Sequence, residues 1–216
     1  MTQLTIEYLI EAARAFTEHE NEHDEPKLFG VDNGKTIGTY LENKFTIFLN
    51  QVYEFAEGNA ASGIDIPGLN VDIKTTSISQ PQSSCPFRSA RQKVYGLGYN
   101  LLVFVYSKKD DQVAQTARLN IVRVIYVDEA RTADFQMTKG LLQIIANEGN
   151  EEDISAFLFD KNLPVDEISA ANLATEILSN PPQQGYLTIS NAQQWRLQYG
   201  RAITQAGQVS GLLRIY

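Results

Sequence analysis

The sequence is poor in the side chains that build disulfide frameworks and zinc centres. It has one cysteine, Cys85, and two histidines among 216 residues. A single cysteine excludes a disulfide framework and a cysteine cluster for metal, and the reducing cytoplasm is the expected location. No run approaches the roughly 18 apolar residues of a membrane span, and the first residues lack the basic region of a signal peptide. We therefore expect a cytoplasmic protein with no membrane partner.

Carboxylates are missing from two stretches of a chain that is otherwise acidic. The net charge is −8, yet no Asp or Glu lies between Lys74 and Lys109, and none lies in residues 190–216. A phosphate-binding face built from two separated basic segments has this charge distribution. Chance clustering is the alternative interpretation. The pattern favours a nucleic-acid partner despite the negative sum.

Glycine-rich phosphate loops are also missing. Gly96-Leu97-Gly98 is too short for a dinucleotide fingerprint and precedes an apolar run instead of following one. We expect no nucleotide cofactor.

The spacing of apolar residues predicts an α/β fold. Helical periodicity marks residues 3–20, 36–57, 88–96, 133–147, 166–179 and 190–206, and strand patterns mark 64–66, 70–78, 99–107, 118–127 and 208–215. This order predicts a mixed β-sheet flanked by helices, with a helical C-terminal part over about 133–216. The length suits a single domain over residues 1–216.

One short segment carries groups suited to phosphodiester hydrolysis. It reads Asp65, six residues, then Asp72-Ile73-Lys74. Magnesium prefers oxygen ligands, which the two carboxylates and the backbone carbonyl of Ile73 supply. Alternation along a strand puts Lys74 on the same face as Asp72, where its charge can activate a water. A turn at Pro67-Gly68-Leu69 would bring Asp65 back beside Asp72. The competing interpretation is an exposed edge strand with a surface ion pair.

This pattern resembles the PD-(D/E)xK nuclease superfamily, which includes most type II restriction endonucleases. The spacing is most similar to the branch with the mismatch-repair nicking endonuclease, whose lysine is followed by threonine, as Thr75 follows Lys74 here. The resemblance covers about residues 36–127 as the catalytic core. It implies a restriction-endonuclease-like fold and Mg²⁺-dependent hydrolysis of double-stranded DNA. It also implies that Glu42, on the preceding helix, points into the site. Two departures are Ile64, where proline is usual, and Asp72 in place of glutamate.

Residues that contact DNA are expected in both carboxylate-free stretches. Phosphate contacts and base readout are separate tasks. The candidates for phosphate contact are Arg88, Arg91 and Lys93. The candidates for base readout are Gln80, Gln82, Ser83 and Ser84 in a loop, and Gln193, Gln194 and Arg196 on the predicted last helix. Solvated helix residues are the alternative for the last group, and Trp195 is expected in the core.

Other functions fit fewer residues. His19-Glu20-Asn21-Glu22-His23 spells the HExxH signature of zinc metalloproteases, but its polar surroundings favour a solvated helix end. A serine or cysteine hydrolase would have to recruit the same histidines. A DNA-binding module without catalysis, or a strand-nicking repair endonuclease, remains open. Cutting both strands of a palindrome would favour a homodimer, so a site-specific type II endonuclease acting as a homodimer is the leading prediction.

Overall fold

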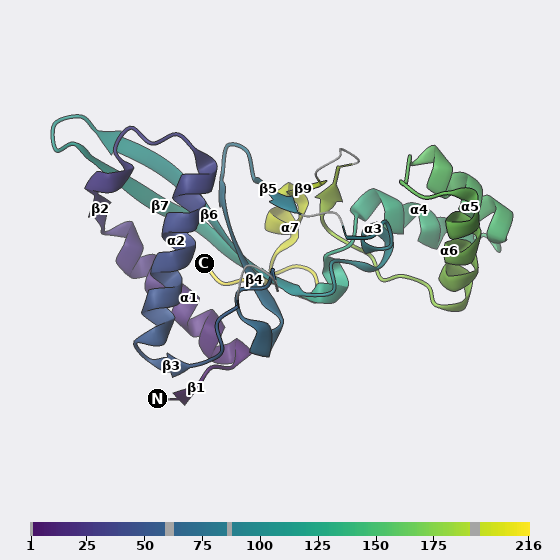
Figure 1. The fold of residues 1–216 in the computed structure, drawn as a ribbon, viewed down its shortest axis with the longest axis horizontal. Coiled ribbons are helices and arrows are strands. Elements are labelled where there is room, and N and C mark those ends of the chain that lie inside the picture. Colours follow the sequence, from purple (N-terminus) through teal and green to yellow (C-terminus); the bar gives the residue numbers. More distant parts are fainter. Residues whose placement is uncertain (1, 59–62, 86–87, 191–194) are drawn as a thin grey trace. The chain divides into compact units, whose positions relative to one another are not determined.

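A computed structural model describes residues 2–58, 63–85, 88–190 and 195–216. The chain divides into two compact units (Figure 1). Unit 1 comprises Met1–Ser83, Tyr99–Val127 and Gln205–Tyr216, and unit 2 comprises Ser84–Gly98 and Asp128–Thr204. The predicted α/β class, with a mixed sheet and flanking helices, is confirmed. That all 216 residues act as one nuclease domain stays a prediction.

The sheet of unit 1 places the predicted catalytic strand at an edge. Its strand order is β10-β7-β6-β4, and β2 pairs with the first residues of β7. Strands β4 and β6 run parallel, whereas β6-β7 and β7-β10 are antiparallel. The strands are β2 (Asp24–Glu25), β4 (Val71–Ser77), β6 (Asn100–Asp111), β7 (Thr116–Val127) and β10 (Leu212–Arg214). As the last strand in the order, β4 turns one side of its backbone away from this sheet.

Two long helices, α1 (Ile6–Asn21) and α2 (Gly34–Asn50), pack against this sheet (Figure 1). Helix α1 contacts β7 and α2 contacts β4. The rings of Phe16, Phe45 and Phe104 meet in the core between helices and sheet, with centroids 5.0 to 5.8 Å apart. After α2, strand β3 (Tyr53–Glu54) pairs in parallel with β1 (Thr2–Gln3). The core therefore fixes α2 alongside the edge strand β4.

Unit 2 combines a helical core with short strands. Its helices are α3 (Gln92–Tyr95), α4 (Phe135–Ala146), α5 (Glu151–Asp160) and α6 (Glu167–Ser179), followed by α7 (Gly200–Gln205) at its end. Its strands are β8 (Thr188–Ile189) and β9 (Trp195–Gln198), and β5 (Gln82–Cys85) leads into it. Leu141, Leu158 and Ile177 are among the fully buried residues of the helical core. Trp195 is 1% exposed, as expected for a core residue.

The prediction of a helix over residues 190–206 was wrong. Residues 195–198 form strand β9, and among the described residues of this segment only Gly200–Gln205 are helical. Burial alternates along the strand, with Trp195 and Leu197 inside and Arg196 and Gln198 outside. This period of two is the strand pattern, and apolar residues at every second position override the helix-forming tendency of Gln and Arg.

Several other boundaries differ from the sequence prediction. The second helix ends at Asn50 instead of residue 57, because Tyr53 and Glu54 pair with β1. The segment 64–66 contributes a single bridge, Ile66 to Val71, in place of a strand. The helix predicted over 88–96 is shortened to Gln92–Tyr95, and the predicted loop with Gln80, Gln82, Ser83 and Ser84 contains β5. Helix α5 was not predicted, although Asn150 and Asp153 form a capping box at its start.

No helix within the described residues is long and apolar enough to cross a membrane.

Candidate active site and DNA-binding residues

A tight turn returns Asp65 to the edge of β4. Ile66 and Val71 exchange two backbone hydrogen bonds of 2.9 and 3.2 Å across the 3₁₀ turn Pro67–Leu69. Asn70 closes the turn in the left-handed conformation, with φ 53°, which asparagine tolerates better than most residues. The Asp65 carboxylate then accepts a 2.7 Å hydrogen bond from the backbone N–H of Ile73. The turn thus places an exposed carboxylate on the free edge of the strand.

Gly58 helps to hold this turn and was not singled out from the sequence. Its N–H donates a 2.8 Å hydrogen bond to the carbonyl of Asp65. A Cβ at this position would lie only 1.7 Å from the carbonyl oxygen of Ile64. The backbones therefore approach too closely for any side chain, which is one of the roles glycine serves. In the sequence, nothing distinguished Gly58 from an ordinary loop glycine.

Asp72 and Lys74 form an ion pair on one face of β4. The Nζ of Lys74 lies 2.7 Å from Oδ2 of Asp72, and the two side chains are 23% and 5% exposed. Because side chains alternate along a strand, both project from the same face, as the sequence predicted. Because the carboxylate of Asp72 is buried, this ion pair does not fit the alternative of a solvated surface pair.

Glu42 approaches the same edge from α2. Helix and strand are close here, since a Cβ built on Gly38 would lie 3.8 Å from Cβ of Thr75 and 3.7 Å from Oε1 of Glu42. Burial raises the pKa of Glu42, the charge of Lys74 lowers it and the charge of Asp65 raises it. The structure therefore brings Glu42, Asp65, Asp72 and Lys74 into one electrostatic cluster.

Burial and crowding of negative charge shift the protonation of this cluster. Burial, together with the neighbouring Asp65 carboxyl, raises the pKa of Asp72 from 3.8 to about 7 despite the opposing effect of Lys74. Burial would lower the pKa of Lys74, but Asp72, Glu42 and Asp65 outweigh it and the pKa is raised. With all groups ionised, three carboxylates and one ammonium sum to −2, a charge that a divalent cation would balance.

The donor set fits magnesium better than zinc. Among the described residues, no group of three or more His, Cys, Asp and Glu side chains is arranged to hold a metal ion. Magnesium needs no such cage, because it keeps several waters and binds through one or two carboxylates. Asp65, Asp72 and the Ile73 carbonyl supply oxygen donors only, which suits a hard cation.

The loop that follows β4 is tied to the strand by Thr76. Its Oγ1 accepts a 2.8 Å hydrogen bond from the N–H of Gln82 and lies 3.3 Å from the carbonyl oxygen of Gln80. Thr76 follows Lys74 by two residues, so it is on the same face of the strand as Asp72 and Lys74. Sequence reasoning missed this role. Gln80 and Ser84 are exposed, whereas Gln82 and Ser83 are half-buried.

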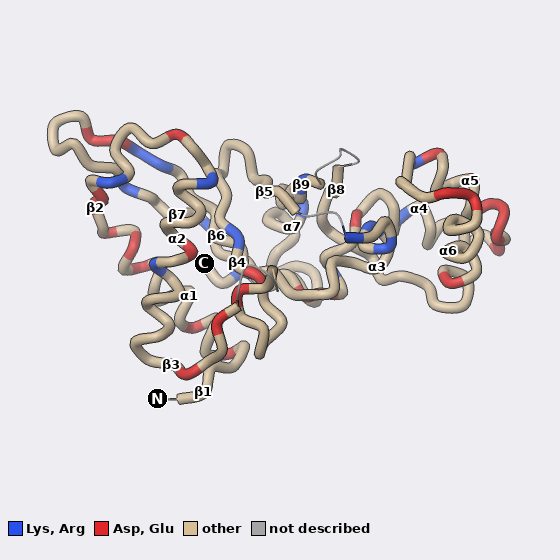
Figure 2. Tube along the Cα trace, viewed as in Figure 1, with Lys and Arg blue, Asp and Glu red and all other residues tan. Residues whose placement is uncertain are grey.

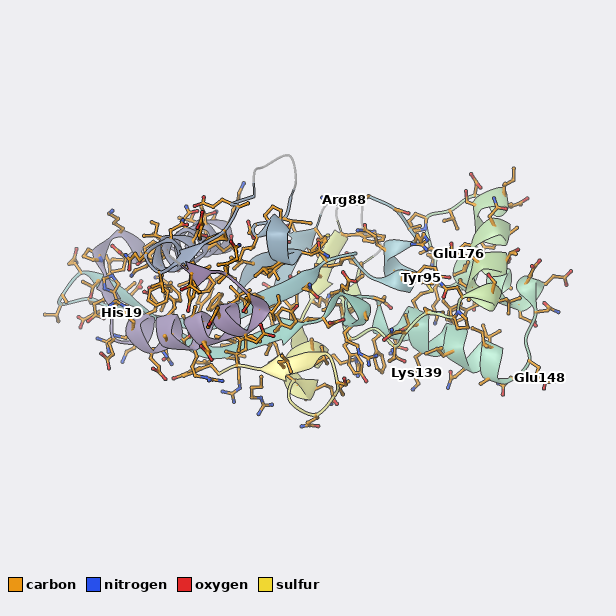
Figure 3. All side chains as sticks on the ribbon, turned by 90° about the horizontal axis from the view of Figure 1, so that it is seen from below. His19, Arg88, Tyr95, Lys139, Glu148 and Glu176 are labelled. Carbon is orange, nitrogen blue, oxygen red and sulfur yellow. The ribbon has the colours of Figure 1, made fainter. Side chains whose placement is uncertain are left out.

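The three basic residues expected at phosphates differ in their surroundings. Arg88 is exposed (Figure 3). Arg91 forms a forked ion pair with Glu176, with Nε at 3.1 and 3.2 Å from the two carboxylate oxygens. Lys93 is buried, 5% exposed, and this burial lowers its pKa. Arg88 is exposed, Arg91 is paired with Glu176 and Lys93 is buried, so the structure does not bring the three together as one exposed basic surface.

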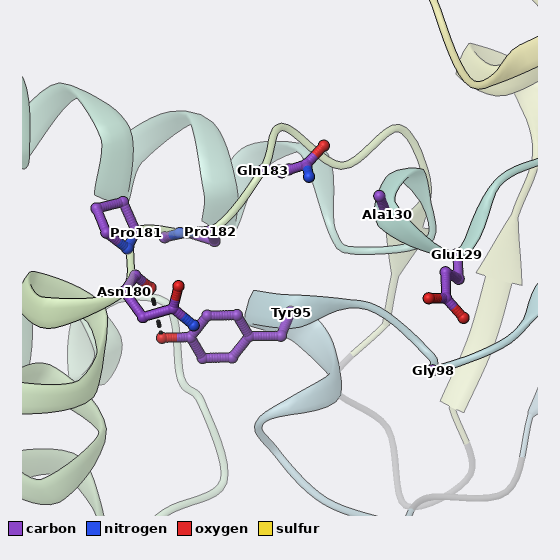
Figure 4. A pocket seen from close by; sticks show the side chains of 8 residues that line it. All are labelled: Tyr95, Gly98, Glu129, Ala130, Asn180, Pro181, Pro182 and Gln183. Atoms are coloured by element: carbon purple, nitrogen blue, oxygen red, sulfur yellow. Dashed lines mark hydrogen bonds between the residues drawn. The ribbon is translucent and has the colours of Figure 1, made fainter.

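A pocket of about 290 Å³ lies beside α3 in unit 2 (Figure 4). Tyr95 lines it, and its hydroxyl donates a 3.0 Å hydrogen bond to the carbonyl of Asn180. The guanidinium of Arg91 stacks on this ring, 4.3 Å from the centroid. The Tyr95 hydroxyl and the Arg91 guanidinium thus both have partners within unit 2, and they connect α3 to the end of α6.

The second predicted group of base-reading residues is on a strand. Arg196 is exposed on β9, so its predicted place on a helix was wrong, whereas its role in reading bases stays a prediction. Gln193 and Gln194 lie outside the described residues.

The HExxH segment is not arranged as a zinc site. Helix α1 ends at Asn21, so His23 is beyond it, 3.5 Å from the carboxylate of Glu25. Glu20 is 1% exposed and pairs with Lys44 at 2.7 Å. The expectation of a solvated helix end was therefore wrong for Glu20, which is buried between α1 and α2, while His19 is exposed.

Comparison with known proteins identifies the class. The chain belongs to a family of type II restriction enzymes, whose family model matches residues 3–214. The family is named after the type II restriction enzyme NspV. NspV from Nostoc sp. (strain ATCC 29411 / PCC 7524) is 62% identical over 216 residues, which cover 100% of this chain and 98% of that protein. No solved structure matched the chain. The prediction of a type II restriction endonuclease is confirmed.

Proposed function

We propose that this restriction endonuclease hydrolyses the phosphodiester bonds of double-stranded DNA with Mg²⁺ at Asp65, Asp72 and Ile73. The observation that carries the proposal is the cluster at the edge of β4, where the exposed carboxylate of Asp65 lies beside the buried carboxylate of Asp72 and its ion pair with Lys74. The membership in a type II restriction enzyme family supports it. The pattern of residues is that of PD-(D/E)xK nucleases, to which we assign the chain.

Each residue has a distinct task in this proposal. Asp65 and Asp72 would hold the cation through carboxylate oxygens, and Ile73 would add its backbone carbonyl. A bound divalent cation would neutralise charge on the phosphate and orient a water. Lys74, held by Asp72, positions the attacking water and stabilises the form that has lost its proton. Glu42 supports Lys74 from α2 and supplies a further carboxylate. The −2 charge repels phosphate, so DNA is expected to bind productively only with the cation present.

The enzyme is proposed to act in the cytoplasm as a homodimer. A two-fold axis would give each strand of a palindromic site its own copy of the cluster. A monomer with one cluster would cut one strand at a time, which makes strand-nicking the alternative within the same chemistry.

The test is cleavage of a long plasmid by purified protein. We expect discrete linear fragments in Mg²⁺, and none in EDTA or with Lys74→Ala. The exposed Lys35→Ala serves as the matched control, since Lys35 lies at the start of α2 in the same unit. Nicked circles without linear product would favour the strand-nicking alternative. Discrete cutting that persists in Lys74→Ala would show that the active site is not on β4.

A further inference from the structure

Strands β8 and β9 present an outer face made of hydrogen-bonding side chains. They pair antiparallel, with Thr188 opposite Gln198 and Ile189 opposite Leu197. Ile189 and Leu197 are buried, whereas Thr188, Gln198 and Arg196 are exposed. Because directly opposite residues share a face of the sheet, Thr188 and Gln198 lie side by side on the outer face. Arg196, two residues before Gln198, is on the same face.

The backbone of this pair is held firmly enough to aim those side chains. The N–H of Arg196 donates a 2.9 Å hydrogen bond to Oγ of Ser190, and the N–H of Ser190 donates to the carbonyl of Arg196 at 3.1 Å. The N–H of Ile189 donates a 2.8 Å hydrogen bond to the buried carboxylate of Asp134, the N-cap of α4. Trp195 anchors the inner face at 1% exposure. The strands therefore project Arg196 and Gln198 from a rigid base.

The chemistry of this face matches the edges of base pairs. Arginine pairs through two hydrogen bonds with guanine, glutamine does so with adenine, and threonine offers both a hydroxyl and a methyl group. β9 is the middle strand of the three-stranded sheet β5-β9-β8. The grooves of DNA admit the strands of β-sheets as well as helices. The face combines these three side-chain types without a carboxylate, since the last acid of the chain is Glu176.

A preorganised cation follows directly after β9. Arg201, on α7, is exposed, and its guanidinium carbon lies 3.7 Å from the ring centroid of Phe135. Phe135 is itself packed edge-on against Tyr186, with centroids 5.8 Å apart. Stacking on an aromatic ring orients a guanidinium while leaving its N–H donors available for phosphate oxygens. None of the ion pairs found among the described residues includes Arg201. Four acids of unit 2, namely Glu151, Glu152, Asp153 and Asp160, are on α5 (Figure 2).

We propose that the outer face of β8 and β9 enters the major groove and reads bases, while Arg201 contacts a neighbouring phosphate. Arg196 and Gln198 are the specificity-determining residues, and Thr188 supports them. This inference rests on the proposed function, because it assigns readout for the same cleavage reaction. It adds Thr188, Gln198 and Arg201 to the expected DNA contacts and replaces a helix by a strand pair.

The first experiment measures specificity. Ends produced by the wild type are sequenced to give the site, and kcat/KM is then measured on that duplex and on every duplex with one base pair changed. We expect Arg196→Ala and Gln198→Ala each to lose roughly 10- to 100-fold on the original site. Each should also lose discrimination at one base pair and its symmetry mate, and keep it elsewhere. Thr188→Val, which keeps the strand shape, should have a smaller effect.

The second experiment measures binding and needs no cutting. Affinity for duplex DNA is followed against salt, with Ca²⁺ in place of Mg²⁺. For Arg201→Ala we expect weaker binding to every duplex and a log–log salt slope reduced by about 1. Phe135→Leu, which removes the stack and keeps the cation, should weaken binding less. The matched controls are Arg214→Ala, an exposed strand arginine of β10, and Lys161→Ala, whose ammonium lies 5.4 Å from the ring centroid of Phe157.

The outcomes distinguish the readout inference from the proposed function. A wild type that cuts DNA, with Arg196 and Gln198 variants that keep full discrimination, would overturn the readout inference and leave the proposed function intact. An unchanged salt slope in Arg201→Ala would overturn its phosphate contact. A wild type that binds duplex DNA through Arg201 but cuts none in Mg²⁺ would overturn the proposed function and not the phosphate contact.

Discussion

The carboxylate of Asp65 accepts a 2.7 Å hydrogen bond from the backbone N–H of Ile73. The N–H and C=O of one strand residue point to the same side of the strand. The carbonyl oxygen of Ile73 therefore faces the edge where Asp65 lies, and the adjacent Asp72 adds its carboxylate. This hydrogen bond thus places the Asp65 carboxylate on the side of β4 that the carbonyl of Ile73 faces.

Two substitutions of Asp65 should separate its structural and catalytic roles. Asparagine still accepts the N–H of Ile73 but carries no charge, whereas alanine does neither. We expect both variants to cut DNA at least about 100-fold more slowly. Only Asp65→Ala should also lose about 1 kcal/mol of unfolding free energy. Cleavage rates and urea unfolding provide the readouts, with the exposed Asp32→Asn as control. Wild-type cutting by Asp65→Asn would contradict the assignment.

Asp72 should make the metal-free protein less stable as pH rises. Its pKa is raised from 3.8 to about 7, so between these values the folded state binds more protons than the unfolded state. The free energy of unfolding then falls as pH rises through about 4 to 7, by at most about 4 kcal/mol. Asp72→Asn should abolish this component, measured by urea unfolding in EDTA at pH 5 and pH 8. An identical pH slope in both proteins would refute it.

Magnesium should reverse that loss at pH 8. Ionised Asp72 is the form that binds a cation, and a ligand present at 100 times its Kd stabilises the folded state by about 2.7 kcal/mol. We expect Mg²⁺ to raise the melting temperature of the wild type at pH 8 and to have little effect on Asp72→Asn. Equal stabilisation of both proteins would place the cation elsewhere.

Glu42→Gln should stabilise the metal-free protein while slowing cleavage. Burial raises the pKa of Glu42 and Asp65 adds repulsion, although Lys74 opposes both, so its charge is costly until a cation arrives. We expect a gain of roughly 1 kcal/mol in unfolding free energy and a loss of about tenfold or more in cutting rate. The exposed Glu11→Gln on α1 is the control. Faster cutting by Glu42→Gln would show that Glu42 does not support the site.

The site was more predictable from the sequence than the surface around it. Alternation along β4 placed Asp72 with Lys74, and the turn residues Pro67 and Gly68 predicted the return of Asp65, because both depend on local geometry. The edge position of β4 was not predictable, since it depends on parallel pairing with β6, which begins 29 residues after β4 starts at Val71. The approach of Gly58 to Ile64 likewise depends on backbones that meet only in the fold.

The C-terminal segment shows where local reasoning failed. Gln and Arg suit helices, and this tendency masked the alternating burial of Trp195 and Leu197. The sequence also contained no sign that Arg91 pairs with Glu176, or that Lys93 is buried in the fold. Charge counts locate basic segments, but tertiary contacts decide which cations stay accessible.

Glu20 and Lys44 form a buried ion pair whose energetic coupling should be large. Glu20 is 1% exposed, and Nζ of Lys44 lies 2.7 Å from its Oε2 and also donates a 2.8 Å hydrogen bond to the hydroxyl of Tyr40. Lys44→Met leaves a carboxylate buried without its cation, which costs about 3 kcal/mol, whereas removing both charges costs less. We therefore expect Glu20→Gln/Lys44→Met to be more stable than Lys44→Met alone.

A double-mutant cycle by urea unfolding measures this coupling. The exposed pair Asp24–Arg118, at 47% and 48% side-chain exposure, is the matched control and should couple by less than about 1 kcal/mol. Equal coupling in the two pairs would show that water reaches Glu20 in solution. Because the pair is outside the cluster on β4, specific cleavage by the folded fraction should be unchanged in every variant. A change in cleavage that exceeds the loss of folded protein would instead connect the Glu20–Lys44 pair to the active site through α2, the helix that carries both Lys44 and Glu42.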